Sequence, residues 1–388
     1  MTDSEWLAIE NATVLPAPNV APIERCTVVA RDGHIVAMGA GIPVPSGAQT
    51  IPGDGRFLMA GFWNAHVHFT ERQWRSAAKA PSAVLDASLR EMLTSRGFTC
   101  VVDTGSDPRI TLPLARRVEA GELRGPAIVT AGTGLYPPRG LPYYLKGEIP
   151  FWVRPLLPQP ATPAAAVRVV DRTIARGASL IKLFTGSYVA RGKVVPMPEG
   201  VARAAVEAAH RHRVLVFSHP SNRAGTDVAV RSGVDVLAHP PDSTEGVDDA
   251  LLLEIVGRRM AMIPTLKMFA TTIGEDPRYL DPIYRVVRRF RELGGQLLFG
   301  TDVGFMPDYS TEGEYQALGR AGLDWPAVLA ALTTAPAERF GVLTDRGIVS
   351  VGRRADLVLL DGDPRTDLLA FARVRATVRG GRVLFVRS

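Results

Sequence analysis

Eight short apolar segments alternate with amphipathic helical segments along the middle of the chain, and this alternation restricts the fold more than any other feature. Short apolar runs separated by helices are typical of parallel strands in a sheet covered by helices. Eight such units favour an α/β fold of the (β/α)8 TIM barrel type, whose active site lies at the carboxyl ends of the strands. An open doubly wound sheet is the competing fold, and it is disfavoured because no Gly-x-Gly-x-x-Gly turn follows an early strand. The expected strands are Met59–His68, Thr99–Thr104, Ala127–Ala131, Leu180–Thr185, Leu215–His219, Val236–His239, Ala261–Leu266 and Leu297–Asp302.

The two ends of the chain have a different pattern, in which short strands are separated by Asp-Gly, Gly-Gly and Gly-Arg turns. We expect residues 1–57 and 347–388 to form one small β-sandwich domain together, and residues 58–346 to form the barrel. A length of 388 residues, of which 46% are hydrophobic, is sufficient for one large and one small domain.

Composition narrows the classes of partner and location. The formal net charge is +6, but the basic residues are spread along the chain, and clusters such as Arg211–Arg213 and Arg288–Arg289 fall in or at the ends of helical segments. Solvated helix faces explain them better than a nucleic-acid surface does. No apolar stretch reaches the roughly 18 residues that cross a bilayer, and Met1–Glu5 lacks the basic and apolar start of a secretory signal. We therefore expect a cytoplasmic protein that binds neither nucleic acid nor membrane, with Cys26 and Cys100 as buried thiols.

A pair of histidines, His66 and His68, closes the first expected strand. Residues two apart on a strand point to the same face, so both imidazoles should converge at its carboxyl end. Neutral imidazole is a common metal ligand, and a rigid strand orders two of them before the metal arrives. Taken alone, the pattern fits a hydrogen-bonded pair of histidines equally well, so the assignment depends on the other strand ends.

Polar residues also occur at the ends of four other expected strands. Lys182 lies within Leu180–Thr185, while His219, His239 and Asp302 each end a strand. Each of them could singly be a structural residue. Together with the two histidines of the first strand, however, they would share one rim of a barrel, which indicates a metal-dependent active site.

These motifs resemble the amidohydrolase superfamily, with His-x-His on the first strand, Ile-Lys-Leu-Phe-Thr-Gly on the fourth and Gly-Thr-Asp on the eighth. Segment Gly352–Leu360 is similar to that family's return to its β domain, so the resemblance covers nearly the whole chain. Within the superfamily, the sequence looks closest to the imidazolonepropionase-like group, which includes metal-dependent dipeptidases acting on Xaa-Pro substrates. The chain departs from many relatives at Gly313-Glu314-Tyr315, where they have a histidine before the helix that follows the eighth strand.

An ordinary lysine ammonium, with a pKa of about 10.4, repels a metal ion, so Lys182 needs another state to act as a ligand. The resemblance implies that Lys182 is carboxylated and bridges two divalent ions. The strand-one histidines and Asp302 would hold the more buried ion, and the histidines of the fifth and sixth strands the other. Zinc fits such nitrogen and oxygen ligands, while manganese, cobalt and iron stay open. The ligand set implied is His66, His68, Lys182, His219, His239 and Asp302.

The expected function is therefore hydrolysis of an amide (C–N) bond in a small substrate, such as a dipeptide or an N-acyl amino acid, by a metal-bridged hydroxide. Asp302 would orient that hydroxide, take its proton and deliver the proton to the leaving nitrogen. A mononuclear deaminase or cyclic amidine hydrolase is the first alternative, although such enzymes do not need Lys182. A lactonase or phosphotriesterase-type esterase would use nearly the same metal centre.

Two further classes are disfavoured. A barrel that has lost catalysis and serves as a scaffold would characteristically lack metal ligands, which this chain retains. A serine hydrolase would need a Gly-x-Ser-x-Gly elbow, and the sequence contains none. A small-molecule substrate is the expected partner, and assembly into a homo-oligomer is left open.

A proline-rich connection, residues 132–162, leaves the carboxyl end of the third expected strand and has too many prolines for a helix. We expect it to cover the metal centre and to contact substrate, since long connections at that face are usually functional. Arg139 or Lys146 would bind a substrate carboxylate. The alternative is a surface excursion without a role. The candidate substrate contacts are Tyr136, Arg139, Tyr143, Tyr144, Lys146 and, beyond the connection, Tyr188.

Overall fold

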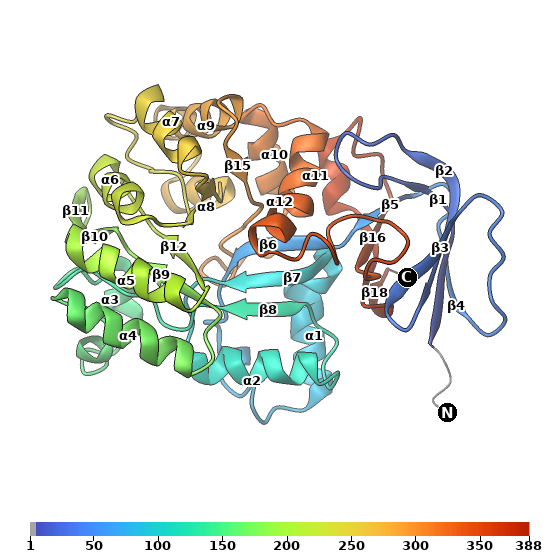
Figure 1. Ribbon diagram of the computed structural model, residues 1–388, viewed down its shortest axis with the longest axis horizontal. Coiled ribbons are helices and arrows are strands. Elements are labelled where there is room, and N and C mark those ends of the chain that lie inside the picture. Colours follow the sequence, from blue (N-terminus) through green and yellow to red (C-terminus); the bar gives the residue numbers. More distant parts are fainter. Residues whose placement is uncertain (1–4, 388) are drawn as a thin grey trace.

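The computed structural model, which describes residues 5–387, has the α/β architecture with parallel strands that the sequence predicts (Figure 1). Most of the N-terminal start considered above, residues 1–4, lies outside the described residues. The eight expected strands all occur, and they pair in parallel as one sheet of three and one of five. The first sheet contains β6 (Phe62–Val67), β7 (Phe98–Asp103) and β8 (Ala127–Thr130). The second contains β9 (Leu180–Leu183), β12 (Leu215–Ser218), β13 (Val236–Leu237), β14 (Ala261–Met262) and β15 (Gln296–Leu297).

Backbone hydrogen bonds join the edges of these two sheets. The amide of Ser179, just before β9, donates to the carbonyl of Thr130 in β8 at 2.9 Å. At the other edge, the amide of Ala65 in β6 donates to the carbonyl of Phe299, which follows β15, at 2.7 Å. The strand pairing itself gives two separate sheets, so the single closed eight-stranded barrel stays a prediction.

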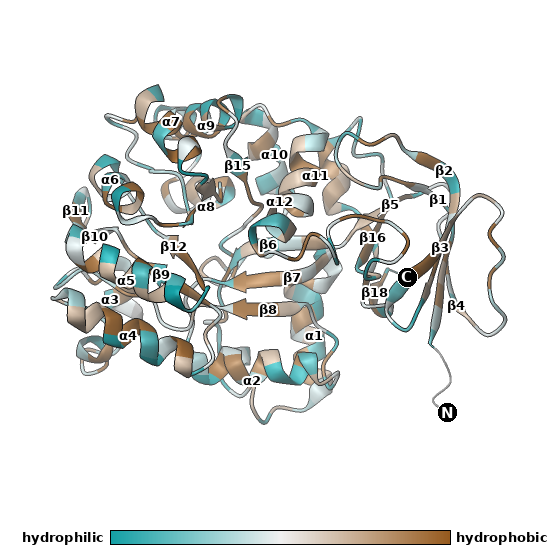
Figure 2. Cartoon of the chain, in the orientation of Figure 1, coloured by the Kyte–Doolittle hydropathy of each residue, from teal (hydrophilic) through white to brown (hydrophobic). Residues whose placement is uncertain are grey.

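Helices cover the outside of these strands and present apolar faces to them (Figure 2). Several begin at side chains that accept a hydrogen bond from the first turn, such as Asp107, Thr162 and Asn222. Alternating strand residues fill a separate inner cluster that includes Val102 and Phe217. The helices are α1 (Ser82–Met92), α2 (Pro108–Glu119), α4 (Pro163–Ala175), α5 (Glu199–Arg211), α6 (Arg223–Ser232), α7 (Asp249–Gly257), α8 (Leu266–Ile273), α9 (Pro277–Glu292), α10 (Glu312–Arg320), α11 (Trp325–Leu332) and α12 (Thr334–Arg339).

The first expected strand, Met59–His68, is broken at Gly61 into β5 (Phe57–Ala60) and β6. The amide of Gly61 donates to the carbonyl of Asp356 at 2.8 Å rather than to a neighbour in the β6 sheet. A Cβ at this position would lie 2.3 Å from Oγ1 of Thr99, so only glycine permits the close approach. The break transfers the chain from one sheet to another.

Strands from both ends of the chain form one eight-stranded mixed sheet, which surrounds its own apolar cluster. The blue and red terminal segments lie on the same side of the molecule (Figure 1). These strands form a single sheet, so the β-sandwich and the domain boundaries stay predictions. The order is β18 (Arg382–Val386), β17 (Val374–Arg379), β16 (Leu357–Leu360), β5, β1 (Trp6–Val14), β2 (Ile23–Arg31) and β3 (His34–Gly39), with β4 (Gln49–Pro52) paired to β1.

The proline-rich connection contains helical turns, so the prediction that its prolines exclude a helix is wrong. A short helix, α3 (Tyr143–Glu148), begins directly after Pro142, and a 3-10 turn, η3 (Arg154–Leu156), has Pro155 near its start. A proline at a helix start costs no hydrogen bond, because the first amides have no partner within the helix.

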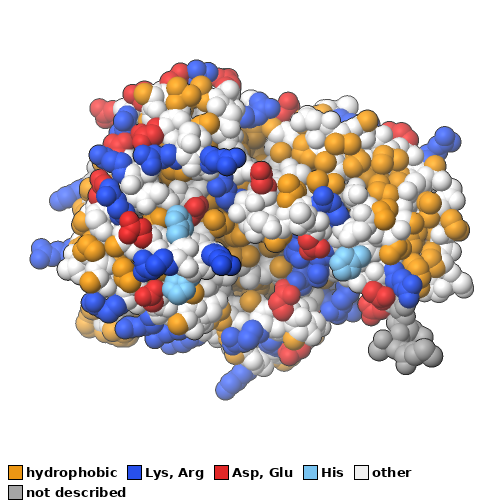
Figure 3. Space-filling model, in the orientation of Figure 1, with side chains coloured by type: hydrophobic (Ala, Val, Ile, Leu, Met, Phe, Trp, Pro, Cys, Tyr) orange, Lys and Arg blue, Asp and Glu red, His pale blue; other side chains and the backbone are white. Residues whose placement is uncertain are grey.

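The surface mixes charges of both signs. On the face shown in Figure 3, basic and acidic side chains are interspersed over the helices, while apolar side chains gather towards the terminal sheet. Among residues 5–387, no helix is long and apolar enough to span a membrane.

Candidate metal centre

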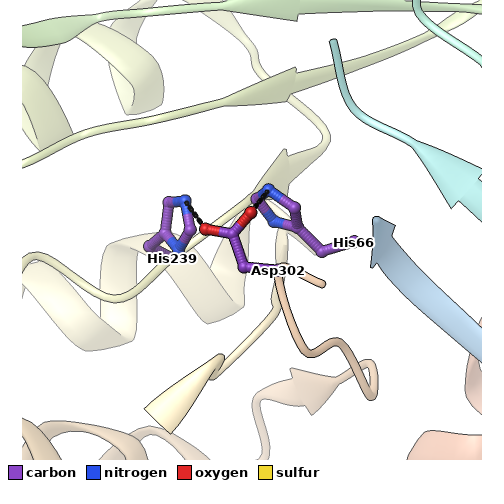
Figure 4. Close-up of side chains that lie close together, drawn as sticks. All are labelled: His66, His239 and Asp302. Carbon is purple, nitrogen blue, oxygen red and sulfur yellow. Dashed lines mark ion pairs between the residues drawn. The ribbon is translucent and has the colours of Figure 1, made fainter. Parts of the chain in front are cut away.

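Three histidines and one aspartate meet at the carboxyl ends of the parallel strands. Nε2 of His66 lies 3.3 Å, and Nε2 of His68 3.0 Å, from Oδ1 of Asp302. Nε2 of His239 lies 3.9 Å from Oδ2 of the same carboxylate. Figure 4 shows His66 and His239 on either side of Asp302, and ligand atoms of these three buried residues lie within 4.8 Å of one another. The strand-end prediction for these four residues therefore corresponds to a real cluster.

A strained turn positions Asp302 in this cluster. Its φ of 57° is in the left-handed region, and its amide donates to the carbonyl of His66 at 2.9 Å. Gly304 continues the turn with a φ of 93°, and a Cβ there would lie 1.8 Å from the carbonyl oxygen of His68. The turn after β15 therefore depends on glycine to bring the carboxylate against both strand-one histidines.

The second ring nitrogen of each histidine determines which nitrogen faces the carboxylate. Nδ1 of His66 lies 2.9 Å from the carbonyl of Ala238, and Nδ1 of His68 lies 3.1 Å from the carbonyl of Gly105. A carbonyl only accepts hydrogen bonds, so in both rings Nδ1 must carry the proton. In the neutral rings, Nε2 then points a lone pair at Asp302, which is the form that ligates a metal.

His239 is held in the same form through a hydroxyl. Its Nδ1 lies 2.7 Å from Oγ1 of Thr265, and that hydroxyl donates to the carbonyl of Pro264 at 2.8 Å. Because the hydroxyl proton is already donated, Oγ1 accepts from Nδ1 of His239. The sequence reasoning missed Thr265, which has a φ of 45° and lies beyond the expected ligands.

Neutral nitrogens and a carboxylate directed at one another leave polar atoms without partners. Nε2 of His66 and Oδ1 of Asp302 are both buried and have no hydrogen-bond partner among the described residues. Unpaired buried polar atoms are costly, and a cation placed between them would satisfy both. The donor set of imidazole nitrogens and carboxylate oxygen fits zinc or another divalent transition metal.

His219 and Lys182 lie beside this cluster. The ring centroids of His219 and His239 are 4.6 Å apart. Phe184 contacts His219 and Lys182, since its ring stacks on that of His219 at 5.1 Å and lies 5.6 Å from Nζ of Lys182. Lys182 is buried within β9, at the same strand ends as the four cluster residues. The six predicted ligands thus occupy one rim, with four of them in closer mutual contact.

Burial controls the electrostatics of this rim. It lowers the pKa of His66 and His239 well below the usual value and that of His219 to about 3. Burial also lowers the pKa of Lys182 to about 7, although the charge of Asp302 opposes the shift. Near neutral pH, a substantial fraction of Lys182 is therefore the neutral amine, which is the form that adds carbon dioxide.

The pKa values of Asp302 and His68 are shifted in the direction opposite to the effect of burial. Burial alone would raise the pKa of Asp302, but the neighbouring His66 and His68 lower it, so this carboxyl stays ionised. Burial alone would lower the pKa of His68, but the adjacent carboxylate of Asp302 raises it. The carboxylate therefore carries the negative charge that a cation would neutralise.

Two polar side chains beside the cluster, those of Asn64 and Asp103, were missed by the sequence reasoning. Asn64 donates from Nδ2 to Oγ1 of Thr301 at 2.7 Å, and its Oδ1 accepts from the amide of His66 at 3.2 Å. Asp103 ends β7 and accepts from Oγ of Ser106 at 2.6 Å. Its position at a strand end was a signal that could have identified it.

Glu314 lies in the segment Gly313–Tyr315, where the resemblance predicts a histidine. Its Oε1 accepts from the amide of Leu266 at 3.0 Å, and its Oε2 from that of Lys267 at 2.7 Å. Burial raises the pKa of Glu314 to about 7. The residue thus ties α10 to the start of α8, directly after Thr265.

The aromatic candidates for substrate contact are packed near the rim. Tyr136 is buried and stacks on Phe184 at 4.6 Å. Tyr144 contacts the rings of Tyr143 at 5.6 Å and Phe305 at 5.7 Å. Burial raises the pKa of Tyr144 well above the usual value, and the charge of Asp302 adds to the shift.

The remaining candidates are Tyr188, Arg139 and Lys146. The hydroxyl of Tyr188 donates to Oδ2 of Asp242 at 3.0 Å. Arg139 is exposed, and Lys146 uses its carbonyl to accept from Arg154. Within residues 5–387, the hydrogen bonds and ion pairs of the metal centre involve neither Arg139 nor Lys146.

Solved structures share this fold. A Xaa-Pro dipeptidase with bound methionine in its active site has a TM-score of 0.82 at 18% identity, with 99% of this chain and 100% of that chain covered. A prolidase complexed with N-methylphosphonate-L-proline has a TM-score of 0.79 at 24% identity, with 99% and 100% covered. A third structure, an amidohydrolase, has a TM-score of 0.79 at 22% identity and covers 99% of both chains.

No curated protein matches the chain. The model of the amidohydrolase family matches residues 57–384, which include every predicted ligand and the strands that carry them. This match confirms the resemblance drawn from the strand-end motifs. The chain therefore belongs to the amidohydrolase family.

Proposed function

We propose that this protein is a metal-dependent hydrolase that cleaves the amide bond of a small substrate, such as a dipeptide or an N-acyl amino acid. One observation carries the proposal: buried imidazole nitrogens converge on the carboxylate of Asp302 and leave Nε2 of His66 and Oδ1 of Asp302 unpaired. Without a cation these two buried atoms stay unpaired, whereas a divalent cation would be bound by both.

The proposed centre is binuclear. His66, His68 and Asp302 would hold one ion, and His219 and His239 the other, with a carboxylated Lys182 between them. The contact of Asp302 with His66 and His68 supports the first ligand set, and the adjacent rings of His219 and His239, 4.6 Å apart, support the second. The low pKa of His219 keeps its ring neutral, as a ligand requires. The two parallel sheets, bonded at both edges, would then act as one (β/α)8 barrel with the ligands at its rim.

Bound divalent ions would supply Lewis acidity and would lower the pKa of the attacking water. The protein itself supplies the proton transfers. Asp302 is ionised, so its carboxylate oxygens can accept the proton of the water and then donate it to the leaving nitrogen. The carbonyls behind His66 and His68 keep both Nδ1 protons in place during this transfer.

Aromatic side chains form the wall beside the proposed centre. The stack of Tyr136, Phe184 and His219 and the contact of Tyr144 with Phe305 would exclude water and limit the size of the substrate. A small substrate is supported also by the similar structures, which include a Xaa-Pro dipeptidase and a prolidase.

A substrate panel combined with metal analysis tests the proposal. The protein would be loaded with zinc and bicarbonate and then assayed on dipeptides, N-acyl amino acids, cyclic amides, cyclic amidines, lactones and phosphotriesters. We expect hydrolysis of linear amides, its loss on chelation and its return with zinc. Asp302→Asn should lower turnover roughly 10² to 10⁴-fold, the usual scale for a positioned acid–base group.

The matched control is Asp171→Asn, which changes an exposed carboxylate on α4 that pairs with His212 at 3.0 Å. This variant should keep full turnover. Hydrolysis of lactones or cyclic amidines alone would contradict the amidase assignment. Full turnover in Asp302→Asn with its metals retained would contradict the role of Asp302.

A further inference from the structure

A partly buried carboxylate, that of Asp242, lies in the segment that follows His239. Asp242 follows His239 by three positions, in the segment between β13 and α7. Its Oδ2 accepts two hydrogen bonds of 3.0 Å each, one from the hydroxyl of Tyr188 in β10 (Gly186–Ala190) and one from the hydroxyl of Tyr279 in α9. Three elements distant in sequence are therefore folded around one carboxylate oxygen.

Asp242 has no cationic partner. Among the ion pairs of residues 5–387, none includes this carboxylate. Burial raises its pKa to about 6, while the hydrogen bonds from Tyr188 and Tyr279 lower it. At neutral pH this partly buried group is thus largely an anion, and its hydrogen-bond donors are neutral, which compensates its charge incompletely.

Aromatic contacts connect Asp242 to the metal centre. The ring of Tyr279 lies 6.5 Å from that of Phe269, which lies 6.0 Å from the ring of His239. The charges of Asp302 and Asp242 both act on the hydroxyl of Tyr144. Tyr144, one of the candidate substrate contacts, is therefore near enough to both carboxylates for each charge to act on it.

An anion hydrogen-bonded by two tyrosine hydroxyls is suited to one class of ligand. A substrate ammonium group would pair with the carboxylate and would also be attracted to the negative faces of the aromatic rings. A substrate carboxylate would instead be repelled. This chemistry contrasts with the predicted role of Arg139 and Lys146, neither of which joins the centre.

We propose that Asp242, held by Tyr188 and Tyr279, is a specificity-determining residue that binds a cationic amino group of the substrate. The inference rests on the proposed function and narrows it: the preferred substrates are amides with a free ammonium on the acyl residue, as in an unblocked dipeptide, over N-acylated ones. If Asp242 only held the two tyrosines in place, its removal would affect both substrate types equally.

Kinetics on matched pairs of substrates tests this. Each dipeptide would be assayed with a free and with an N-acetylated amino terminus, using wild type, Asp242→Asn and the control Glu245→Gln, an exposed carboxylate of the same segment. We expect wild type and the control to favour the free form by about tenfold or more in kcat/KM, the scale of a charge-assisted hydrogen bond. Asp242→Asn should lose this preference, mainly through KM, while keeping its rate on the acetylated form within about threefold.

Binding provides a readout that does not depend on turnover. Calorimetry would use Asp302→Asn, which is expected to turn substrate over slowly, and the double variant that adds Asp242→Asn, with the same pairs of dipeptides. Tighter binding of the free form by Asp302→Asn, lost in the double variant, supports the inference even if no amide is hydrolysed. Equal affinity for the two forms, including no binding of either, overturns it, as does a preference that survives Asp242→Asn. Failure of the metal-loaded wild type on the whole substrate panel would instead refute the proposed function.

Discussion

Nδ1 of His239 donates to Oγ1 of Thr265 at 2.7 Å, and this bond fixes the ring nitrogen that faces Asp302. Thr265→Val would remove the acceptor while keeping the shape of the side chain. Residues that orient a metal ligand typically contribute roughly 10- to 100-fold to metal affinity, so we expect a loss of that size. Thr265→Ser, which keeps the hydroxyl, is the control and should retain affinity. Competition with a chromogenic chelator measures it, and unchanged affinity in Thr265→Val would refute the orienting role.

Lys182 is expected to bridge two ions, so Lys182→Ala should lower the metal content from about two ions per chain towards one or none. Protein for this measurement would be prepared with zinc and bicarbonate and analysed by elemental mass spectrometry. Lys193→Ala, an exposed lysine of β11 (Lys193–Pro196), controls for the loss of a positive charge. If Lys182→Ala keeps two ions and full activity, the bridging role is wrong.

Glu314 should make the folded state less stable as the pH rises. Its pKa is raised by burial from 4.5 to about 7, so the folded protein binds the proton more tightly than the unfolded chain does. The resulting stabilisation is complete below about pH 4.5 and is lost as the pH approaches about 7. We therefore expect Glu314→Gln to reduce the fall in Tm between pH 5 and pH 7.5.

Glu312→Gln is the matched control for that experiment, because Glu312 is exposed in the first turn of the same helix. It should show the pH dependence of the wild type. Metal-free protein should be used, so that titration of the metal ligands with bound ions does not contribute to the difference. An identical pH dependence in Glu314→Gln and wild type would contradict the assignment.

Gly304→Ala should disrupt the turn that carries Asp302. The added Cβ would meet the carbonyl of His68 at 1.8 Å, in a backbone conformation with a φ of 93°. We expect destabilisation of about 3 kcal/mol or more, together with loss of bound metal. Gly192→Ala separates the backbone strain from the steric clash, since Gly192 has a φ of 69° but nothing within 4 Å. That control should cost only about 1 kcal/mol in denaturant unfolding.

The positions of the metal ligands could be predicted from the sequence because parallel strands bring their carboxyl ends together. His66, His239 and Asp302 each end an apolar run, and this alone was sufficient to place them at one rim. What orients them could not be predicted in the same way. The carbonyl of Gly105 and the left-handed backbone of Thr265 depend on loop geometry that leaves no periodic pattern.

Other errors have equally specific causes. The apolar run through Gly61 looked like one strand, since hydrophobicity does not report which sheet a residue joins. Proline content suggested an irregular connection, yet Pro142 and Pro155 stand at helix starts, where they are tolerated. The group formed by Asp242, Tyr188 and Tyr279 was missed because only the tertiary fold brings these residues together.

The break at Gly61 has a consequence for the order of assembly. β5 lies immediately before the strand that carries His66 and His68, and β5 pairs with β16, so that Met59 is registered against Val358. During synthesis, β5 can pair with β16 only after about 300 further residues have been made. Contacts between residues so far apart in sequence form slowly. A ribosome-bound chain that ends before β16 lacks this pairing even when all six ligands have emerged. Ion uptake is thus expected to follow completion of the terminal sheet, late in biogenesis.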